Sequence, residues 1–552
     1  MSVPTTARAA ASVPVIPAPV HVVRAGGTWQ VGDGAVIDGP GDLAAVIARF
    51  VDDLRVDTGL HLVPAGPGAT VDVRVEWDAA GLDGLPAPYG VRADGAEDAD
   101  ERYGLEITPA GALVRGVTAE AIHRGLTTLR QLIAAAVATT GGAVAAVRIT
   151  DAPLLAWRGL SLDVVRTFHD VGTLERVIDM CALHKLNVLH LHLTDDQGWR
   201  FEVPQWPLLA QVGGAGALGD RPGGHYTPAD VTHLVAYAAD RFVTIVPEID
   251  MPGHTGAVFR ASPELAAAPD AATAAAAATM GMTIGALDLE RAGTQTLVSD
   301  VVAAAAAQFS TSAYVHIGAD EAFGMPEADH AAFVEHAVSV VEATGRRAVG
   351  WQEAARGRVG ADALVQYWLD PVETEHMLAS GALADVLPAA VLPLLEENLR
   401  ASLTDVPRAL AQGARVIVSP TTRLYFDRPH ADEGADPEQA ARRARIGLPV
   451  YPPTSLREMV EWDVLAATPG AERLEQLAGL EAALWCETVV DRDDLEGLLL
   501  PRLSGAAERA WSARPTEWEE YVERLASQTH AWDRRGWAWF RPAFLSAQPA
   551  EV

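Results

Sequence analysis

The chain has 552 residues, of which 49% are hydrophobic, so it is long enough for two or three domains with sizeable cores. Its formal net charge of −31 disfavours nucleic acids and anionic membranes as partners, because they carry charge of the same sign. The two cysteines, Cys181 and Cys486, are too few for a disulfide framework and are interpreted as free core thiols. An uncharged or cationic ligand fits such a surface better than a phosphorylated one.

The two ends of the chain carry little structural signal. Residues 1–14 are expected to form a flexible tail, and residues 526–552 a C-terminal segment. Met1–Val20 has no basic region followed by an apolar run, and no stretch approaches the length of a membrane span. We therefore expect a cytoplasmic protein.

Residues 15–152 predict an accessory α+β domain. Apolar and polar residues alternate in Thr70–Glu76 and in Tyr103–Thr108, which is typical of half-buried strands. A turn and a further strand over 112–117 lead into an amphipathic helix predicted for Ala119–Ala135. This mixture differs from the regular pattern that follows it.

Residues 153–525 repeat short apolar runs between longer helical patterns. The eight runs are predicted as strands at Trp157–Val164, Val188–Asp196, Phe242–Asp250, Ala313–Glu321, Arg347–Glu353, Ala363–Asp370, Ala414–Thr421 and Leu480–Thr488. Parallel strands that are buried on both faces give continuous apolar runs of this kind. The expected fold class is therefore α/β, a catalytic (β/α)8 TIM barrel preceded by the smaller α+β domain.

Two segments depart from this repeat. Ala267–Ala278 is rich in alanine and is compatible with a helix or a loop, and the next helix is predicted for Thr294–Gln308. Residues 371–412, between the sixth and seventh strands, are longer than one crossover helix requires. We expect an inserted helical element there, near the barrel mouth, that acts as a lid or contact surface. A last outer helix is predicted for Pro501–Trp511.

The fourth predicted strand ends in two adjacent carboxylates, Asp320 and Glu321. In TIM barrels the C-terminal ends of the strands hold the active site. An acidic N-cap of the following helix is the alternative interpretation of such a pair. The candidates at all the predicted strand ends taken together are Arg158, Asp195, Asp196, Asp250, His254, Asp320, Glu321, Trp351, Trp368, Tyr425, Asp427, Trp485 and Glu487.

This set of side chains favours a sugar as the ligand. Carboxylates and arginine make charge-assisted hydrogen bonds to hydroxyl groups, and tryptophan faces pack against the apolar C–H surface of a pyranose. A phosphorylated ligand would need more cations. For Arg158, a structural ion pair with an acid at the barrel mouth remains an alternative.

His190 and His192 resemble the metal-binding His-x-His of some barrel hydrolases. They lie before the end of their predicted strand, on one side of it, and the fifth and sixth strands supply no histidine to complete a metal shell. We therefore interpret them as hydrogen-bonded histidines of the barrel and expect no metal and no cofactor. Asp250 and His254 are likewise interpreted as an oriented hydrogen-bond pair rather than a chelate.

Several short motifs resemble those of family-20 glycoside hydrolases, the β-N-acetylhexosaminidases. The family pattern His-x-Gly-x-Asp-Glu is met by His316–Glu321. It is accompanied in order by Trp157–Gly159, His192–Arg200, Pro247–His254, Gly350–Trp351, Gln366–Trp368, Tyr425–Asp427 and Leu484–Glu487. Residues 105–109 and 125–132 also resemble the accessory domain of the family, so the similarity covers most of the chain.

The resemblance implies an exo-acting enzyme that removes terminal β-linked N-acetylglucosamine or N-acetylgalactosamine with retention of configuration. In this family the substrate's own 2-acetamido oxygen attacks C1 and forms an oxazolinium intermediate. Glu321 is then the general acid and base, Asp320 orients the acetamide, and Tyr425 binds its oxygen. The other implied contacts are Trp351, Trp368 and Trp485 around the sugar, Arg158, Asp427 and Glu487 on its hydroxyls, His254 at the substrate, and Asp195, Asp196 and His316 in support.

The chain departs from the family pattern in few places. Ala319 stands where glycine is common, Cys486 where threonine is frequent, and the insertion at 371–412 leaves the preferred leaving group open. The choice between gluco and galacto substrates and between a monomer and a homodimer also stays open. Two other functions remain to be tested, a non-catalytic N-acetylhexosamine-binding protein on the same barrel and a metal-dependent barrel hydrolase.

Overall fold

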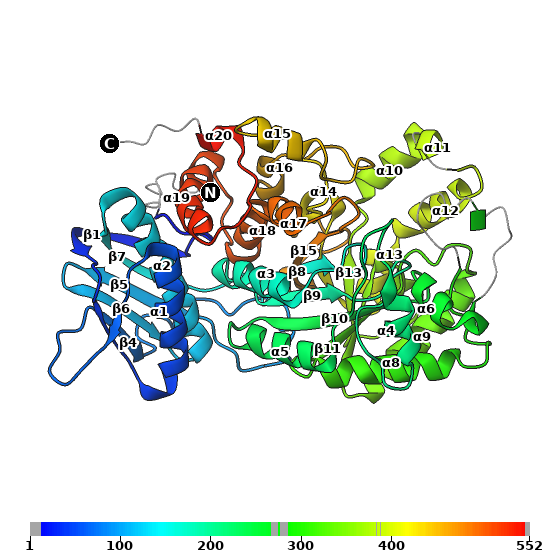
Figure 1. The fold of residues 1–552 in the computed structure, drawn as a ribbon, viewed down its shortest axis with the longest axis horizontal. Coiled ribbons are helices and arrows are strands. Elements are labelled where there is room, and N and C mark those ends of the chain that lie inside the picture. The colour runs from blue at the N-terminus through cyan, green and yellow to red at the C-terminus, as the bar shows by residue number, and fades with distance from the viewer. Residues whose placement is uncertain (1–12, 267–273, 276–284, 382, 387, 547–552) are drawn as a thin grey trace, which may run out of the picture.

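The computed structural model describes residues 13–546 except 267–273, 276–284, 382 and 387. The chain forms two domains side by side, one around an open sheet and one around a closed barrel (Figure 1). The expected tail lies outside the described residues up to position 12, as does most of the alanine-rich stretch at 267–278. Val13 and Val15 are buried in the core of the smaller domain.

The smaller domain is a seven-stranded mixed sheet with two helices. Its strands, in sheet order, are β1 (His21–Gln30), β7 (Ala143–Asp151), β5 (Tyr103–Thr108), β6 (Gly111–Gly116), β4 (Val73–Trp77), β2 (Val36–Asp38) and β3 (Val63–Pro64). Helix α2 (Ala119–Thr140) packs on the sheet and against α1 (Ala44–Thr58) (Figure 1). Its apolar stripe, including Ile122, Leu129 and Ile133, is buried with Leu105 and Val114 of the sheet.

The larger domain is a closed barrel of eight parallel strands, so the predicted fold class is confirmed. The strands are β8 (Trp157–Asp163), β9 (Val188–His192), β10 (Thr244–Met251), β11 (Tyr314–Gly318), β12 (Arg347–Trp351), β13 (Leu364–Tyr367), β14 (Arg415–Val418) and β15 (Leu477–Leu484). Each predicted run overlaps one of them, although β10 ends one residue later and β15 begins three residues earlier than predicted. Most strands end before the predicted limit, because the polar residues that follow turn into loops over the barrel mouth.

Helices surround the barrel, and they include those predicted at Thr294–Gln308 and Pro501–Trp511. The longer ones are α3 (Val171–Leu183), α5 (Pro228–Ala239), α8 (Thr294–Gln308), α9 (Glu327–Ala343), α17 (Arg492–Leu499), α18 (Arg502–Trp511) and α19 (Trp518–Arg534). The shorter ones are α4 (Pro207–Gln211), α6 (Gly256–Ala261), α14 (Thr421–Leu424), α15 (Pro437–Arg443), α16 (Leu456–Val460) and α20 (Ala543–Ser546). Short 3-10 turns are η1 (Gly41–Leu43), η2 (Gly213–Ala215), η3 (Pro263–Leu265), η4 (Gln352–Arg356) and η5 (Leu474–Gln476).

The segment between β13 and β14 is helical. It forms α10 (Pro371–Ser380), α11 (Leu383–Val386), α12 (Leu392–Ser402) and α13 (Asp405–Ala411). In Figure 1, α10, α11 and α12 lie at the end of the barrel domain that is remote from the smaller domain. Val391 and Leu395 of this segment reach the cavity at the barrel mouth that is described below.

The two domains are joined by buried polar contacts. Glu101 of the smaller domain accepts hydrogen bonds from Arg124 at 2.8 Å and from Arg158 of β8 at 3.0 Å. Trp511 of α18 packs in the core of the smaller domain, and its ring N–H donates to Asp151 at 3.0 Å. Helix α19 packs against both α1 and α2, and the boundary expected between residues 525 and 526 falls inside it.

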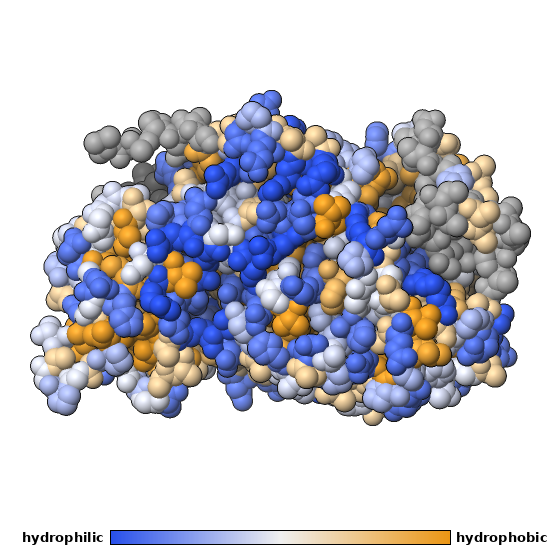
Figure 2. Space-filling model, in the orientation of Figure 1, coloured by the Kyte–Doolittle hydropathy of each residue, from blue (hydrophilic) through white to orange (hydrophobic). Residues whose placement is uncertain are grey.

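The surface in Figure 2 is mixed, with hydrophilic residues broken by scattered apolar ones. Among the described helices, none combines the length and the apolar character that a membrane crossing requires.

Candidate active site

A cavity of about 260 Å3 opens at the C-terminal ends of the barrel strands. We call it the mouth cavity. The side chains that line it follow seven of the eight barrel strands, namely Arg166 after β8, Asp195 after β9, His254 after β10, Asp320 and Glu321 after β11, Trp368 after β13, Tyr425 after β14, and Trp485 and Glu487 after β15. Most of the predicted site residues therefore meet in one hollow.

The loop after β11 turns sharply and directs both acids into this cavity. Gly318, Ala319 and Glu321 all have left-handed φ angles, of 68°, 78° and 45°. A Cβ on Gly318 would come within 1.7 Å of Asp250 Oδ1, so only glycine fits there. Helix α9 begins later, at Glu327, which excludes an N-cap role for the acid pair.

His254 connects the two acids. Its Nε2 lies 3.6 Å from Asp320 Oδ2 and 3.4 Å from Glu321 Oε2, and its Nδ1 lies 3.1 Å from Asp195 Oδ1. Although burial disfavours the charged imidazole, the carboxylates of Asp195 and Asp250 raise the pKa of His254 well above its usual value. The imidazole is therefore a cation facing both acids.

Asp320 and Asp250 are held in a poorly solvated environment. Burial raises the pKa of Asp320 to about 7, with the charge of Glu321 adding to the shift and His254 opposing it. Burial also raises the pKa of Asp250 well above its usual value, and the neighbouring Asp320 adds to that shift. Neither carboxylate oxygen of Asp250 makes a hydrogen bond among the described residues. Asp320 therefore titrates near neutral pH, beside an Asp250 carboxyl that its surroundings hold towards the neutral form.

Aromatic rings form the wall beside the acids. Trp368 and Tyr425 stack with ring centroids 6.2 Å apart and only 9° between their planes. Trp485 lies 6.2 Å from Tyr425, and its face carries the guanidinium of Arg166 at 5.1 Å. Trp351 lies behind Trp368 and Trp485, at 6.4 and 5.9 Å, and does not line the cavity itself. Trp368, Tyr425 and Trp485 together make an aromatic box for a small apolar group or a sugar face.

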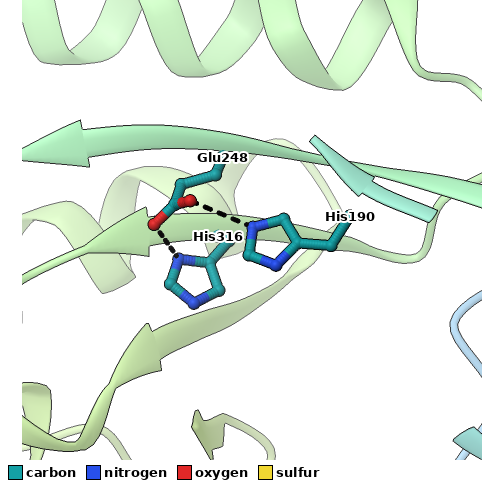
Figure 3. Close-up of side chains that lie close together, drawn as sticks. All are labelled: His190, Glu248 and His316. Carbon is teal, nitrogen blue, oxygen red and sulfur yellow. Dashed lines mark ion pairs between the residues drawn. The ribbon is translucent and has the colours of Figure 1, made fainter. Parts of the chain in front are cut away.

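Beneath the cavity, buried histidines and carboxylates form a network of polar contacts. Figure 3 shows Glu248 of β10 between His190 and His316, at 3.2 and 3.1 Å. Glu248 also lies 2.6 Å from His192 Nδ1, whose Nε2 faces Asp195 at 2.9 Å. These contacts extend from the barrel interior to Asp195 and, through Asp195, to His254 at the mouth cavity. His316 takes part in this support and does not reach the cavity.

The same network of contacts includes groups with the spacing of metal ligands. Three donor atoms lie within 4.8 Å of one another in the sets His190–Glu248–His316 and Asp250–His254–Asp320, for example. In the first set, each imidazole already faces a carboxylate oxygen at ion-pair distance. Contacts of both imidazoles with the Glu248 carboxylate therefore explain that arrangement, in line with the interpretation of His190 from the sequence, and the absence of a metal stays a prediction.

Comparisons with known families agree with this geometry. The catalytic-domain model of glycosyl hydrolase family 20 matches residues 155–328 and 399–514, and the model of the same family's domain 2 matches residues 12–152. The chain belongs to glycosyl hydrolase family 20. The break in the catalytic match, from 329 to 398, includes most of the helical segment between β13 and β14.

Individual family-20 relatives align over most of this hydrolase. A β-N-acetylhexosaminidase of Cellulomonas fimi is 34% identical over 457 residues, which cover 82% of this chain and 83% of the relative. The structure of a mutant Streptomyces plicatus β-hexosaminidase in complex with its product GlcNAc superposes with a TM-score of 0.77, at 31% identity and 97% coverage of both chains. A Streptomyces coelicolor β-N-acetylhexosaminidase gives 0.76 at 32% identity, covering 97% and 98%.

The prediction that Arg158 binds the sugar is wrong. Arg158 is the second residue of β8, so it lies at the N-terminal end of the barrel, fully buried and bound to Glu101 of the other domain. The alternative interpretation, a structural ion pair, is the correct one. The acid is Glu101, however, and it meets Arg158 at the end of the barrel opposite to the mouth. Arg166, which follows β8, is the arginine of the mouth cavity and lies 2.6 Å from Asp195 and 3.9 Å from Glu487.

Two other predicted residues stand back from the cavity. Asp427 is buried, does not line it, and makes no side-chain hydrogen bond among the described residues. Burial and the neighbouring Glu487 raise its pKa well above the usual value. Asp196 accepts a hydrogen bond from the backbone N–H of Gly256 at 2.8 Å and so holds the loop that carries His254.

Several residues that line the cavity were not predicted from the sequence. Tyr451, Leu448 and Phe323 come from loops without a recognisable pattern, so no sequence signal marks them. Arg166 could have been found, because it lies three residues beyond the end of β8, where functional side chains of a barrel gather.

Proposed function

We propose that the chain is a retaining exo-β-N-acetylhexosaminidase that uses the acetamido group of its substrate as the nucleophile. The observation that supports this most is the shared position of Asp320 and Glu321, both facing His254 in one cavity beside the aromatic box. Two acids that share one cation act on neighbouring atoms, so they do not flank a sugar as an acid and a separate nucleophile do. The substrate then supplies the missing nucleophile, held close to C1.

In this mechanism Glu321 protonates the glycosidic oxygen and later takes a proton from the attacking water. Asp320, as an anion, accepts a hydrogen bond from the acetamide N–H and stabilises the positive charge that grows on it. Tyr425 donates a hydrogen bond to the acetamide oxygen and, with Trp368 and Trp485, confines the acetyl group. Arg166 and Glu487 bind the hydroxyls of the terminal sugar, the role first assigned to Arg158.

The relatives and the small cavity support a proposal for the substrate class. The Streptomyces plicatus structure contains GlcNAc as product, and a cavity of about 260 Å3 suits one terminal sugar. We therefore propose terminal β-linked N-acetylglucosamine or N-acetylgalactosamine as the sugar that is released, without a cofactor.

The test is hydrolysis of aryl N-acetyl-β-glucosaminide by the wild type and by Glu321→Gln. The variant is expected to lose about a hundredfold to ten-thousandfold in kcat, while still binding N-acetylglucosamine. The first product seen by NMR is expected to be the β-anomer. A wild type that binds the sugar without turnover would instead support the non-catalytic alternative, and an α-anomer would exclude retention.

A further inference from the structure

A second cavity, of about 310 Å3, lies on the other side of Glu321. It shares Glu321 and Phe323 with the mouth cavity, but Asp320, Trp368 and Tyr425 do not line it. One wall is the loop after β11, and the other is helix α12 of the segment between β13 and β14. We call it the α12 cavity.

We propose that the α12 cavity holds the leaving sugar, and that Glu397 makes it select a pyranose with a free ammonium group over a neutral one and reject an anionic one. This inference rests on the proposed function. A general acid must contact the oxygen between the two sugars, so it lies at the border of their two sites. Glu321 has this position between the two cavities.

Helix α12 is placed to form both sites. Leu395 lines the mouth cavity, whereas Leu394, Glu397, Asn398 and Ala401 line the α12 cavity. The family match of the catalytic domain ends at 328 and resumes at 399, so most of these residues lie outside it. Most of this wall therefore lies in a part of the chain that the family model does not match, where a preference for one leaving group is expected to differ between relatives.

The charges of the α12 cavity favour a cation. Its one arginine, Arg356, is already bound by Asp405 at 2.8 Å and Asn398 at 2.7 Å. Glu353 accepts a hydrogen bond from the Trp368 ring N–H at 3.0 Å, and Glu327 pairs with Arg408 at 3.0 Å.

Glu397 remains as the carboxylate that can meet a ligand. It is exposed at the cavity and makes no ion pair within the described part of the chain. An ammonium group there gains an attraction, whereas a carboxylate is repelled. The preceding residue, Glu396, pairs with Arg400 at 2.7 Å and does not line the cavity, so it offers a matched control.

The experiment measures kcat/KM for three disaccharides in which terminal N-acetylglucosamine is β-linked to glucosamine, N-acetylglucosamine or glucuronic acid. The methyl β-glycoside is the fourth substrate, because its leaving group leaves the α12 cavity empty. The wild type is expected to prefer the glucosamine disaccharide, at a pH where its amine is protonated. Glu397→Gln should lower that rate about two- to fivefold and leave the neutral disaccharide unchanged. Glu396→Gln should change neither.

A second variant, Ala401→Trp, tests the position of the site independently of charge. The larger side chain fills the α12 cavity, so all three disaccharides should lose at least tenfold while the methyl glycoside stays within twofold. Equal losses on all four substrates, or a Glu397→Gln enzyme with unchanged selectivity, would overturn the inference. Failure of the proposed function would look different, because the wild type would then hydrolyse none of the four.

Discussion

At the scale of single residues, the environment of Asp320 sets the pH range in which the site has the protonation state that catalysis needs. Its carboxyl has a pKa of about 7 because it is buried and lies beside Glu321, and the His254 cation limits the shift. The proposed mechanism needs the anion, because only the anion stabilises the positive charge on the acetamide nitrogen. The protonation of one side chain therefore links the rate to pH.

We predict that kcat/KM falls as the pH drops below about 7, since Asp320 of the free enzyme becomes protonated. Asp320→Asn should lack this acidic limb and should be slower by roughly a hundredfold to a thousandfold at pH 8. The measurement is the pH profile of kcat/KM for both proteins. An unchanged limb in the variant would show that another group titrates.

Asp320 should also lower stability as the pH rises. Its pKa is raised on folding, from 3.8 to about 7. The neutral carboxyl therefore stabilises the folded state fully below pH 3.8, and this stabilisation is lost progressively as the pH rises from 3.8 to about 7. Asp320→Asn removes this loss, so its stability relative to the wild type should increase between pH 4 and pH 8 in urea unfolding.

Substitutions of Gly318 and Gly345 separate the cost of a left-handed φ angle from the cost of a steric clash with Asp250. Both Gly318 and Gly345 have left-handed φ angles, of 68° and 77°, but an added Cβ meets Asp250 only at Gly318 and open space at Gly345. Gly345→Ala should cost about 1–2 kcal/mol through the φ angle alone. Gly318→Ala should cost clearly more and should lower activity, as measured by urea unfolding and kcat/KM. Similar costs at both positions would contradict the close contact.

At the scale of elements, the two ends of β8 carry different arginines with different tasks. Arg158, near the start, is bound by Glu101 of the other domain, whereas Arg166, after the end, faces the mouth cavity. Parallel strands place everything beyond their C-terminal ends on one rim, so a shift of eight positions moves a side chain from one rim to the other. Choosing the arginine at the wrong end of β8 therefore assigns sugar binding to a structural residue.

The arginines therefore predict opposite phenotypes. Arg158→Leu leaves the buried Glu101 without one of its partners, and should destabilise the protein by about 3–5 kcal/mol while the folded fraction keeps its kcat/KM. Arg166→Leu should lower kcat/KM at least about tenfold, because substrate hydroxyls lose a charged partner. Denaturant unfolding and kinetics on both variants check this. A catalytic loss in folded Arg158→Leu would restore the original assignment.

The elements themselves were largely predictable, because eight apolar runs and their helices have unmistakable periods. Even the start and end of α8, Thr294 and Gln308, match the prediction. The sequence did not show how far from the cavity a side chain at a strand end lies. Trp351 ends a strand beside the site residues, yet it lies behind the box, and its ring N–H is bound to Glu248 at 2.8 Å. Periodicity reports which side of a strand faces inward, but not which layer of the barrel a ring occupies.

At the scale of the whole molecule, the domains share their interior. Trp511 from the barrel domain is fully buried in the core of the smaller domain, and Arg158 and Glu101 cross the same boundary. Sequence reasoning placed the domains correctly in order, but contacts between residues far apart in the chain leave no local pattern. The site depends on this arrangement only through stability, because every residue of the mouth cavity belongs to the barrel domain.

Such an interface predicts that the chain unfolds as one unit. Calorimetry should show a single transition for the wild type, and Trp511→Ala should lower stability by about 3–5 kcal/mol because it opens a cavity in the shared core. Two separate transitions in the wild type would show that the domains are independent.

In the proposed mechanism, the acetamido oxygen of the substrate displaces the leaving group. This displacement is tested most directly by kcat/KM for aryl β-glucosaminides whose N-acetyl group carries zero, one, two or three fluorine atoms, since fluorine makes the amide oxygen a weaker nucleophile. We expect a steep and steady fall across this series, and negligible hydrolysis of the glucoside that lacks the acetamido group. Rates that do not depend on fluorination would contradict this mechanism.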